Sequence, residues 1–454
     1  MSLSRQLAAW CANPALTFPA SAVRAAEAAI TDVIGCLLGG RRDPAVINAS
    51  RAFAHESGGA SAVTHSVPIA APWAALINGC AAHALDFDDN FFPAVTHASA
   101  SLVPALLALG EETDATPAAI VHAYIVGLEV QAQVGKLVNP SHYAAGWHAT
   151  STLGTLGVAA ACAVLMRLDE HRVLHALSVA TSLAGGSKRQ FGSMVKPLHA
   201  GFAAMHGIMA ARLAAAGITG AEDTLQGPWS FAELYAGQGQ VQPPPAQLFP
   251  QRPLAIDEYG LVAKLYPSCM SSHLGIDALL DLRRHDDFDA SRVSRVDVHL
   301  PAFMVANLRY EHPRTPTEAR FSMNYCAAVA LLDGAPHMAH FTDAALARVD
   351  IQGLMPHVHR HVRPASPEAA TLPWGGDCSA SITLDDGQVL ETHWTYPKGC
   401  ARNPLTLDEQ WRKFSDCADG NLNGLPPRPL FDALSGFSRL PSLGLVTASL
   451  RAQP

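Results

Sequence analysis

Several kinds of residue are scarce in this chain. Only 15% of its 454 residues are charged and 7% are aromatic, and the formal net charge is −8 with histidine neutral. A mildly acidic, sparsely charged chain lacks the basic surface that nucleic acids require, and a hydrophobic share of 49% argues against disorder. The composition therefore predicts a folded protein without a nucleic-acid partner.

Disulfides, membrane spans and a secretion signal are also not indicated. The nine cysteines are odd in number and never stand at CxxC spacing, which is typical of reduced thiols in a core rather than a disulfide framework or zinc knuckle. The longest apolar stretches, such as residues 158–166, are far shorter than the roughly 20 residues of a membrane helix. Residues 1–5 do not resemble a secretory signal, so we expect a soluble, cytoplasmic protein.

Familiar catalytic signatures are missing as well. The chain has no GxGxxG after a strand, no GxxxxGK[ST], no HExxH and no GxSxG. Readings as a nucleotide-dependent enzyme or a serine hydrolase are therefore disfavoured.

Alanine-rich segments with helical periodicity dominate the first 220 residues. Ser21 is predicted to cap a helix that runs through Leu38 and ends at Gly39 and Gly40. Alanine and glycine on several helix faces indicate close backbone approach inside a multi-helix body. Further helices are predicted at 73–85, 99–109, 117–137, 151–168, 169–183 and 197–216.

The pattern changes after a proline-rich connection at 238–253, which cannot continue a helix. Residues 293–300 alternate like a strand, and 378–396 reads as a hairpin that turns at 385–387. Further helices are predicted at 271–282, 318–332, 407–416 and 429–434. We therefore predict a mainly α protein with a smaller α+β part: an all-helical domain over 1–258 and 401–454, and an α/β domain over 259–400.

The 21 histidines invite hypotheses of proton transfer or metal binding, and their local context separates them. Asp86, Asp88 and Asp89 lie close together, which predicts that one of them has a raised pKa. His97 follows shortly afterwards, just before a helix, and is a candidate acid or base. The alternative is an acidic turn that caps a helix.

Two further segments carry candidate binding groups. His148 lies between Trp147 and a helix start, where backbone N–H groups favour an anion, although a structural histidine is the alternative. Arg189 and Lys196 follow two glycines, and such cations suit a carboxylate, although a solvated loop is common. Lys196 precedes a proline that suits a helix start.

The second domain contributes weaker candidates. His273 lies at a helix entry after several hydroxyl residues, and Arg320 and Tyr325 share a predicted helix; capping and packing are the alternatives. The histidines of 357–361 alternate as strand neighbours do, but no carboxylate or cysteine spacing supports a metal there. We interpret that run as an exposed strand or loop.

Taken in order, these segments resemble the MmgE/PrpD family across most of the chain. The resemblance is carried by the following runs: Ala84-Leu85-Asp86-Phe87-Asp88-Asp89 with Thr96-His97, Gly146-Trp147-His148 with Gly154-Thr155-Leu156-Gly157, Lys196-Pro197-Leu198-His199-Ala200-Gly201, Tyr266-Pro267 with His273, Ala319-Arg320-Phe321-Ser322 with Tyr325, and Pro397-Lys398-Gly399 with Asn403-Pro404-Leu405. One run would carry little weight, whereas the ordered set is specific.

The resemblance implies a large all-helical domain, a smaller α/β lid domain, a homodimer and no cofactor. It implies a small di- or tricarboxylate substrate and proton abstraction α to a carboxylate, which serves dehydration of 2-methylcitrate, decarboxylation of cis-aconitate or epimerisation of iminodisuccinate. The residues that it implicates in catalysis are Asp86, His97, His148, His273 and Tyr325, and those that it implicates in substrate binding are Asn90 and Lys196. Arg189 is added to the substrate-binding candidates from the cationic run itself.

The roles of these groups stay open at this point. His148 or Asp86 would act as the base, and His97 or His273 as the opposing acid. Two other functions compete with a cofactor-independent lyase or isomerase: a metal-dependent hydrolase that uses the histidine and aspartate clusters, and a non-catalytic homologue that binds a carboxylate.

Overall fold

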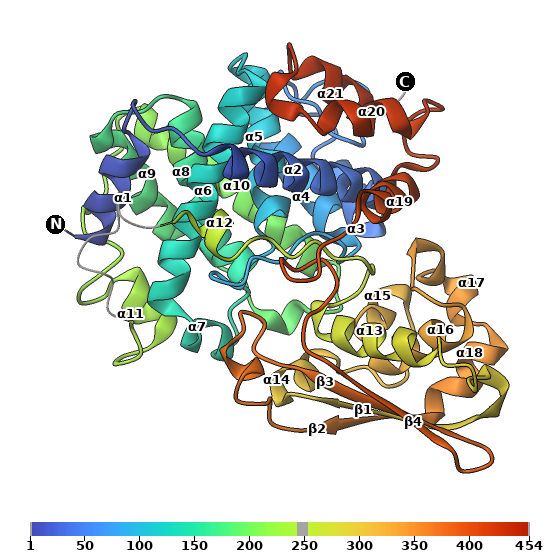
Figure 1. Cartoon of the computed structure of the whole chain (residues 1–454). Helices are drawn as coiled ribbons and strands as arrows, with labels where there is room; N and C mark the ends of the chain where they lie inside the picture. The colour runs from blue at the N-terminus through green and yellow to red at the C-terminus, as the bar shows by residue number, and fades with distance from the viewer. Residues whose placement is uncertain (1, 243–252, 453–454) are drawn as a thin grey trace. The chain divides into compact units, whose positions relative to one another are not determined.

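A computed structural model describes residues 2–242 and 253–452, so part of the predicted proline-rich connection lies outside the described residues. The chain divides into two compact units: Met1–Ala84 with Asp88–Leu261 and Trp411–Pro454, and Leu85–Phe87 with Val262–Gln410. The first unit is helical, and the second is built around a four-stranded sheet (Figure 1). The prediction of a mainly α protein with a smaller α+β part is confirmed.

The helical unit is a packed bundle whose inner helices are buried on almost every face. Its helices are α1 (Leu3–Cys11), α2 (Ala20–Gly40), α3 (Pro44–Ala52), α4 (Ala71–Ala84), α5 (Ala98–Glu112), α6 (Pro117–Val138), α7 (Ser141–Ala144), α8 (Ala149–Leu165), α9 (Glu170–Leu183), α10 (Val195–Ala215), α11 (Phe231–Ala236), α12 (Ala255–Glu258), α20 (Pro427–Leu434) and α21 (Gly444–Leu450). The helix α8 buries nearly all its side chains, as its all-round apolar sequence predicts. The predicted helices of the first 220 residues are confirmed within a few residues at each end.

Two glycines let α4 and α10 approach backbone to backbone. A Cβ atom on Gly79 would lie 2.8 Å from Cα of Gly201, and a Cβ on Gly201 would lie 2.2 Å from the carbonyl oxygen of Leu76. Neither position has room for a side chain. The predicted close approach is therefore real, and it places the second half of α4 beside the first turns of α10.

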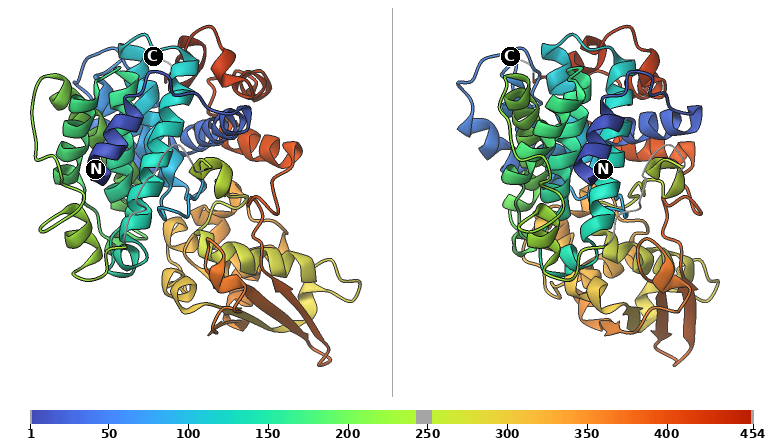
Figure 2. Two further views of the ribbon diagram at one scale, coloured as in Figure 1. Left: turned by 60° about the vertical axis from the view of Figure 1, so that its left-hand side comes forward. Right: turned by 90° about the vertical axis from the view of Figure 1, so that its left-hand side faces the viewer.

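The first long helix begins differently from the prediction. Pro19 occupies the N-cap position of α2, and Ser21 lies inside the first turn, where its side chain caps nothing. With Pro19 as the N-cap, the helix starts two residues earlier than it would with Ser21 as the cap. At the other end of the chain, α20 returns to pack against α2, as the red and blue ribbons show (Figure 2).

The sheet of the second unit has strand order β2-β1-β3-β4. The strands are β1 (Val293–Leu300), β2 (Val358–Val362), β3 (Cys378–Leu384) and β4 (Val389–Trp394). β1 pairs with β2 in parallel and with β3 antiparallel, and β3 and β4 form the predicted hairpin. Side chains along β3 alternate strictly between buried and half-buried, because helices cover one face of the sheet. The histidine run at 357–361 largely forms β2.

The helices of this unit include one correction. They are α13 (His273–Leu282), α14 (Ala302–Asn307), α15 (Pro316–Ala319), α16 (Met323–Leu332), α17 (Asp343–Leu346) and α18 (Val349–Leu354), and α19 (Leu407–Ala418) follows at the boundary between the units. The helix predicted over 318–332 is interrupted between α15 and α16. Ser322 causes the break, because its hydroxyl accepts the backbone N–H of Tyr325 at 3.1 Å and starts a new helix.

Two predictions about composition can be checked in the described part of the chain. All nine cysteines are buried and none is paired in a disulfide, which agrees with their interpretation as core thiols. No helix among the described residues combines the length and the hydropathy that a membrane span requires.

Candidate active site

The N-termini of three helices meet in the helical unit. His97 is the N-cap residue of α5, and its backbone N–H donates to the hydroxyl of Thr150, in the first turn of α8, at 3.0 Å. His148 is the N-cap residue of α8, and its Nδ1 lies 2.8 Å from Nδ1 of His199 in α10. Lys196 lies in the first turn of α10 and is buried. Because helix N-termini carry a partial positive charge, this corner of the bundle favours an anion.

A buried carboxylate lies between two of the imidazoles in this corner. Oδ2 of Asp88 lies 2.8 Å from Nδ1 of His83, the residue next to the end of α4, and 3.2 Å from Nδ1 of His97. Burial alone would raise the pKa of Asp88, but the contacts with His83 and His97 outweigh it and hold that pKa well below its usual range. Asp88 is therefore ionised inside the protein.

The neighbouring carboxyl group behaves in the opposite way. Burial raises the pKa of Asp89 to about 7, and the negative charges of Asp32 and Asp88 contribute to the rise. The hydrogen bonds from Ser99 act in the opposite direction but do not cancel the shift. The hydroxyl of Ser99 donates to Asp89 and lies 2.7 Å from the hydroxyl of Tyr124. The prediction that one carboxyl of the aspartate cluster has a raised pKa is confirmed.

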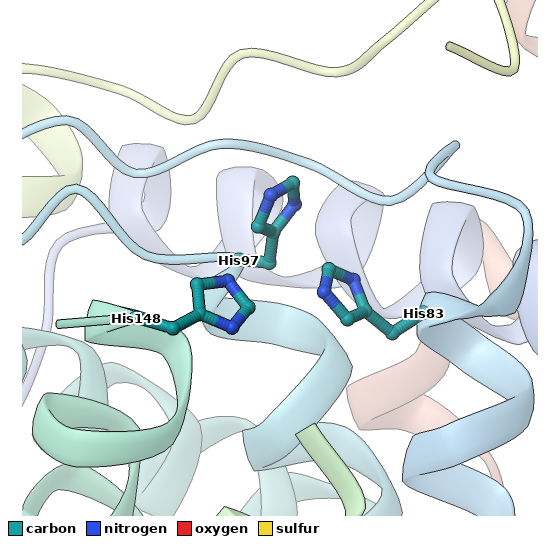
Figure 3. Close-up of side chains that lie close together, drawn as sticks. All are labelled: His83, His97 and His148. Carbon is teal, nitrogen blue, oxygen red and sulfur yellow. The ribbon is translucent and has the colours of Figure 1, made fainter. Parts of the chain in front are cut away.

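Three imidazoles face one another in the cluster. The ring centroid of His83 lies 4.5 Å from that of His97 and 5.7 Å from that of His148 (Figure 3). Burial lowers the pKa of His83 to about 3, although the charge of Asp88 opposes the shift. Burial also lowers the pKa of His148 well below its usual value. Neutral imidazoles can both accept and donate a proton, which is the property that proton-transfer chemistry needs.

The same three side chains are the natural candidates for holding a metal ion. His83, His97 and His148 each offer a ligand atom, and these atoms lie within 4.8 Å of one another. Three imidazoles would suit zinc in number and kind. However, the positive charge of Lys196 acts on both His83 and His148, and the helix N-termini add to it. Lys196 and the helix N-termini thus oppose a cation in the cluster, whereas the ionised Asp88 beside His83 and His97 favours one.

Asp86 belongs to the second unit, where it forms a buried ion pair with Lys264. The ammonium group of Lys264 also donates to the backbone carbonyl of Asp86 at 2.9 Å. Asp86 has a φ angle of +52°, in the left-handed region that a residue other than glycine rarely adopts. The two contacts from Lys264 hold this conformation in place.

The other predicted residues of the second unit have defined partners. His273 begins α13, and its Nε2 lies 3.3 Å from the carbonyl oxygen of Ser268. The hydroxyl of Tyr325 donates to the carbonyl oxygen of His340, and burial raises the pKa of Tyr325. Both side chains are therefore held in fixed orientations.

The residues predicted from sequence are divided between the two units. His97, His148 and Lys196 share the cluster in the helical unit, whereas Asp86, His273 and Tyr325 belong to the other unit. The roles of those three residues stay predictions.

Two predicted binding residues in the helical unit also stay predictions. Asn90 is half-buried, and its amide nitrogen has no hydrogen-bond partner among the described residues. Arg189 is exposed on the short 3-10 helix Lys188–Gln190.

Four residues of these networks were not among the site residues predicted from sequence. Asp88 and His83 flank Asp86 in the chain, and His199 closes the run that begins at Lys196, so each stood beside a recognised residue. Lys264 is a single lysine between apolar residues, and this position was the only indication in the sequence that its charge is buried and paired. None of the four could be paired with its partner without the tertiary structure.

Two family models match the chain. The MmgE/PrpD N-terminal domain matches residues 5–244, and the MmgE/PrpD C-terminal domain matches residues 266–424. The matches together cover most of the chain, on both sides of the segment that is not described.

Curated relatives agree with these matches. Cis-aconitate decarboxylase of Homo sapiens is 29% identical over 84% of this chain and 79% of its own length. Cis-aconitate decarboxylase of Mus musculus is 31% identical over 75% of this chain and 70% of its own length. Cis-aconitate decarboxylase of Aspergillus terreus is 24% identical over 96% of this chain and 94% of its own length. The chain therefore belongs to the MmgE/PrpD family.

Proposed function

We propose that the chain is a cofactor-independent lyase that acts on a small di- or tricarboxylate by proton transfer beside a carboxylate. The observation that carries this proposal is the meeting of three imidazoles and Lys196 at the N-termini of α5, α8 and α10. The family supports an enzyme of the lyase type, and the names of the relatives make decarboxylation of cis-aconitate the first reaction to test. Dehydration of 2-methylcitrate and epimerisation of iminodisuccinate use the same groups.

Binding of the substrate follows from the charges in the cluster. A polycarboxylate would exchange its hydration for the ammonium group of Lys196 and for the N–H groups of the helix N-termini. These groups are buried or nearly so, and in such surroundings each charge-assisted hydrogen bond is stronger than in water. Removal of a proton α to a carboxylate leaves an enediolate-like charge, which the same groups stabilise.

The imidazoles supply the proton transfers. In dehydration, one group accepts the α-proton, and an opposing acid protonates the hydroxyl as it leaves as water. In decarboxylation, carbon dioxide departs and the electron pair that stays on carbon takes a proton from an imidazolium. In epimerisation, a proton is removed from one face and returned to the other. The same imidazoles can thus catalyse all three reactions. Which reaction occurs depends on the leaving group and on the face of the carbon that is protonated.

The test is proton NMR in deuterated water with cis-aconitate, 2-methylcitrate and iminodisuccinate as the panel. We expect product formation or α-proton exchange with at least one acid, and a decrease of about 10²–10⁴-fold in its rate in the His97→Gln variant. Absence of turnover and exchange with every acid would refute the proposal, and binding without either would favour the non-catalytic homologue. Prior dialysis against EDTA should leave the rate unchanged, whereas a loss that zinc restores would favour the metal-dependent alternative.

The proposal includes the quaternary state and the location that the family resemblance and the composition suggest. We infer a homodimer in the cytoplasm, without a nucleic-acid or membrane partner. Light scattering and fractionation of cells test these two parts without reference to the activity.

A further inference from the structure

One carboxylate oxygen in the helical unit lies within hydrogen-bond distance of His83 and within ion-pair distance of His97. Oδ2 of Asp88 lies 2.8 Å from Nδ1 of His83 and 3.2 Å from Nδ1 of His97, and the Asp88 side chain has no exposed surface. His83 and Asp88 are joined by a turn at the end of α4, whereas His97 comes from the N-terminus of α5. The carboxylate therefore connects two elements of the bundle at the centre of the candidate site.

The chemistry of a carboxylate determines which nitrogen of each ring carries the proton. An ionised carboxylate accepts hydrogen bonds and cannot donate one, so a neutral imidazole that faces it through Nδ1 keeps its proton on Nδ1. The other nitrogen, Nε2, then has a lone pair. An imidazole held in this way can accept a proton from a substrate, because its only vacant position is directed away from the carboxylate.

Exposure separates the two rings. The side chain of His97 is 13% exposed, whereas that of His83 is fully buried. A group that exchanges protons with a substrate must be reachable, so His97 is the imidazole of this pair that suits the role of base. Asp86 suits it less well, because its carboxylate is already engaged by Lys264.

We propose that Asp88 is a positioning residue that holds His97 with Nε2 unprotonated and stabilises the imidazolium that forms when His97 accepts a proton. The proposal rests on the proposed function, because it assigns His97 as the imidazole that accepts the α-proton in dehydration or epimerisation and that donates the proton, as the imidazolium, in decarboxylation. His83 completes the arrangement by occupying the other side of the same carboxylate oxygen. It thereby fixes where that oxygen lies relative to His97.

The tautomer can be measured without any substrate. Two-bond ¹H–¹⁵N correlation spectra of the full chain, labelled in its histidines, distinguish a ring protonated on Nδ1 from one protonated on Nε2. The His97 and His83 signals are assigned by their disappearance in the His97→Gln and His83→Gln variants. We expect both rings to carry the proton on Nδ1 in the unaltered protein. A neutral His97 protonated on Nε2 would overturn the proposal, even if no variant of Asp88 folds.

The Asp88→Asn variant tests the cause. An amide donates through its nitrogen as well as accepting through its oxygen, so at least one of the two rings should change to the Nε2-protonated form. We expect kcat to fall by about 10²–10⁴-fold while KM changes little, as for a residue that orients a catalytic imidazole. The Asp88→Glu variant, which keeps the carboxylate, should retain the Nδ1 tautomer and part of kcat.

The matched control is Asp89→Asn, which makes the same replacement at the next residue. Asp89 is also buried, but its carboxyl group contacts Ser99 rather than an imidazole. It should leave both tautomers and kcat unchanged. Unchanged tautomers and kcat in Asp88→Asn would refute the positioning role. If no acid of the panel reacts, the proposed function fails. The NMR measurement of the two tautomers, with and without the Asp88 carboxylate, still tests whether Asp88 positions His97.

Discussion

The buried ion pair between Lys264 and Asp86 allows a quantitative test of the reasoning from burial. Replacement of Lys264 by methionine keeps most of the length and the apolar character of the side chain but removes the ammonium group. The carboxylate of Asp86 would then stay inside the protein without its ion-pair partner, and the backbone carbonyl of Asp86 would lose the donor that lies 2.9 Å away.

The expected effect follows from burial. The Lys264 and Asp86 side chains are 0% and 4% exposed, so water cannot replace the lost partner. Breaking a buried pair by removal of one member costs about 3–5 kcal/mol of stability. At roughly 2–4 °C per kcal/mol for a body of this size, Lys264→Met should lower the melting temperature of the affected transition by about 6–20 °C.

A double-mutant cycle with Asp86→Asn measures the interaction itself. Because an asparagine side chain carries no charge, the double variant should be less destabilised than the sum of the two single changes. The control is the pair of Arg428 and Asp432, whose side chains are 59% and 55% exposed. Its coupling should not exceed about 0.5 kcal/mol, because water screens such pairs.

Differential scanning calorimetry of the full chain provides the measurement. If Lys264→Met lowers the melting temperature no more than Arg428→Gln does, the argument from burial is wrong. Additive effects of Lys264→Met and Asp86→Asn would likewise show that the two groups do not stabilise each other.

Three further predictions concern the helical unit. Lys196→Met should weaken binding of a polycarboxylate about 10–100-fold in titration calorimetry, because one charge-assisted hydrogen bond is lost. The control is Arg212→Gln, which removes a surface ion pair on the same helix and should leave the affinity unchanged. Equal affinities of the two variants would show that Lys196 does not bind the substrate. Asp89→Asn should change the pH dependence of stability: the folded protein keeps this carboxyl protonated to about pH 7, the unfolded chain releases the proton near the ordinary value of 3.8, and stability falls as the pH rises through that window. The variant has no such proton to lose, so its urea midpoint should exceed that of the unaltered protein at pH 8 and match it at pH 4, and the same midpoint difference at both pH values would contradict this account. Gly201→Ala should cost about 1–3 kcal/mol, because its Cβ would lie 2.2 Å from the carbonyl oxygen of Leu76, whereas Gly353→Ala, with open space around it, should cost nothing measurable by the same urea titration.

Most of the local structure could be predicted from the sequence, because it depends on neighbours in the chain. Hydrophobic periodicity predicted the long helices of the first 220 residues, although not the shorter α1, α3 and α7, and the strand pattern predicted β1 and the hairpin of β3 and β4. The two errors were also local. Pro19 begins α2 in place of Ser21, and Ser322 divides a predicted helix, since each residue has a backbone preference that the periodicity conceals.

The ordered runs of the sequence likewise identified the family and three members of the cluster. His97, His148 and Lys196 were recognisable because each stands at a helix start, where its position depends on the local sequence. The partners of these residues were not recognisable. His199 contacts His148 from 51 positions away, and such a pairing depends on how α8 and α10 pack.

Only the tertiary structure decided the protonation of the aspartate cluster. Asp88 and Asp89 are adjacent and chemically identical, yet one is ionised between two imidazoles and the other has a pKa of about 7. The sequence by itself determined that carboxylates, imidazoles and a lysine occur in a family-specific order. Which of them carries a proton depends on burial and on charges brought from distant segments, because the free energy of an ion is determined by its surroundings in space rather than by its neighbours in the chain.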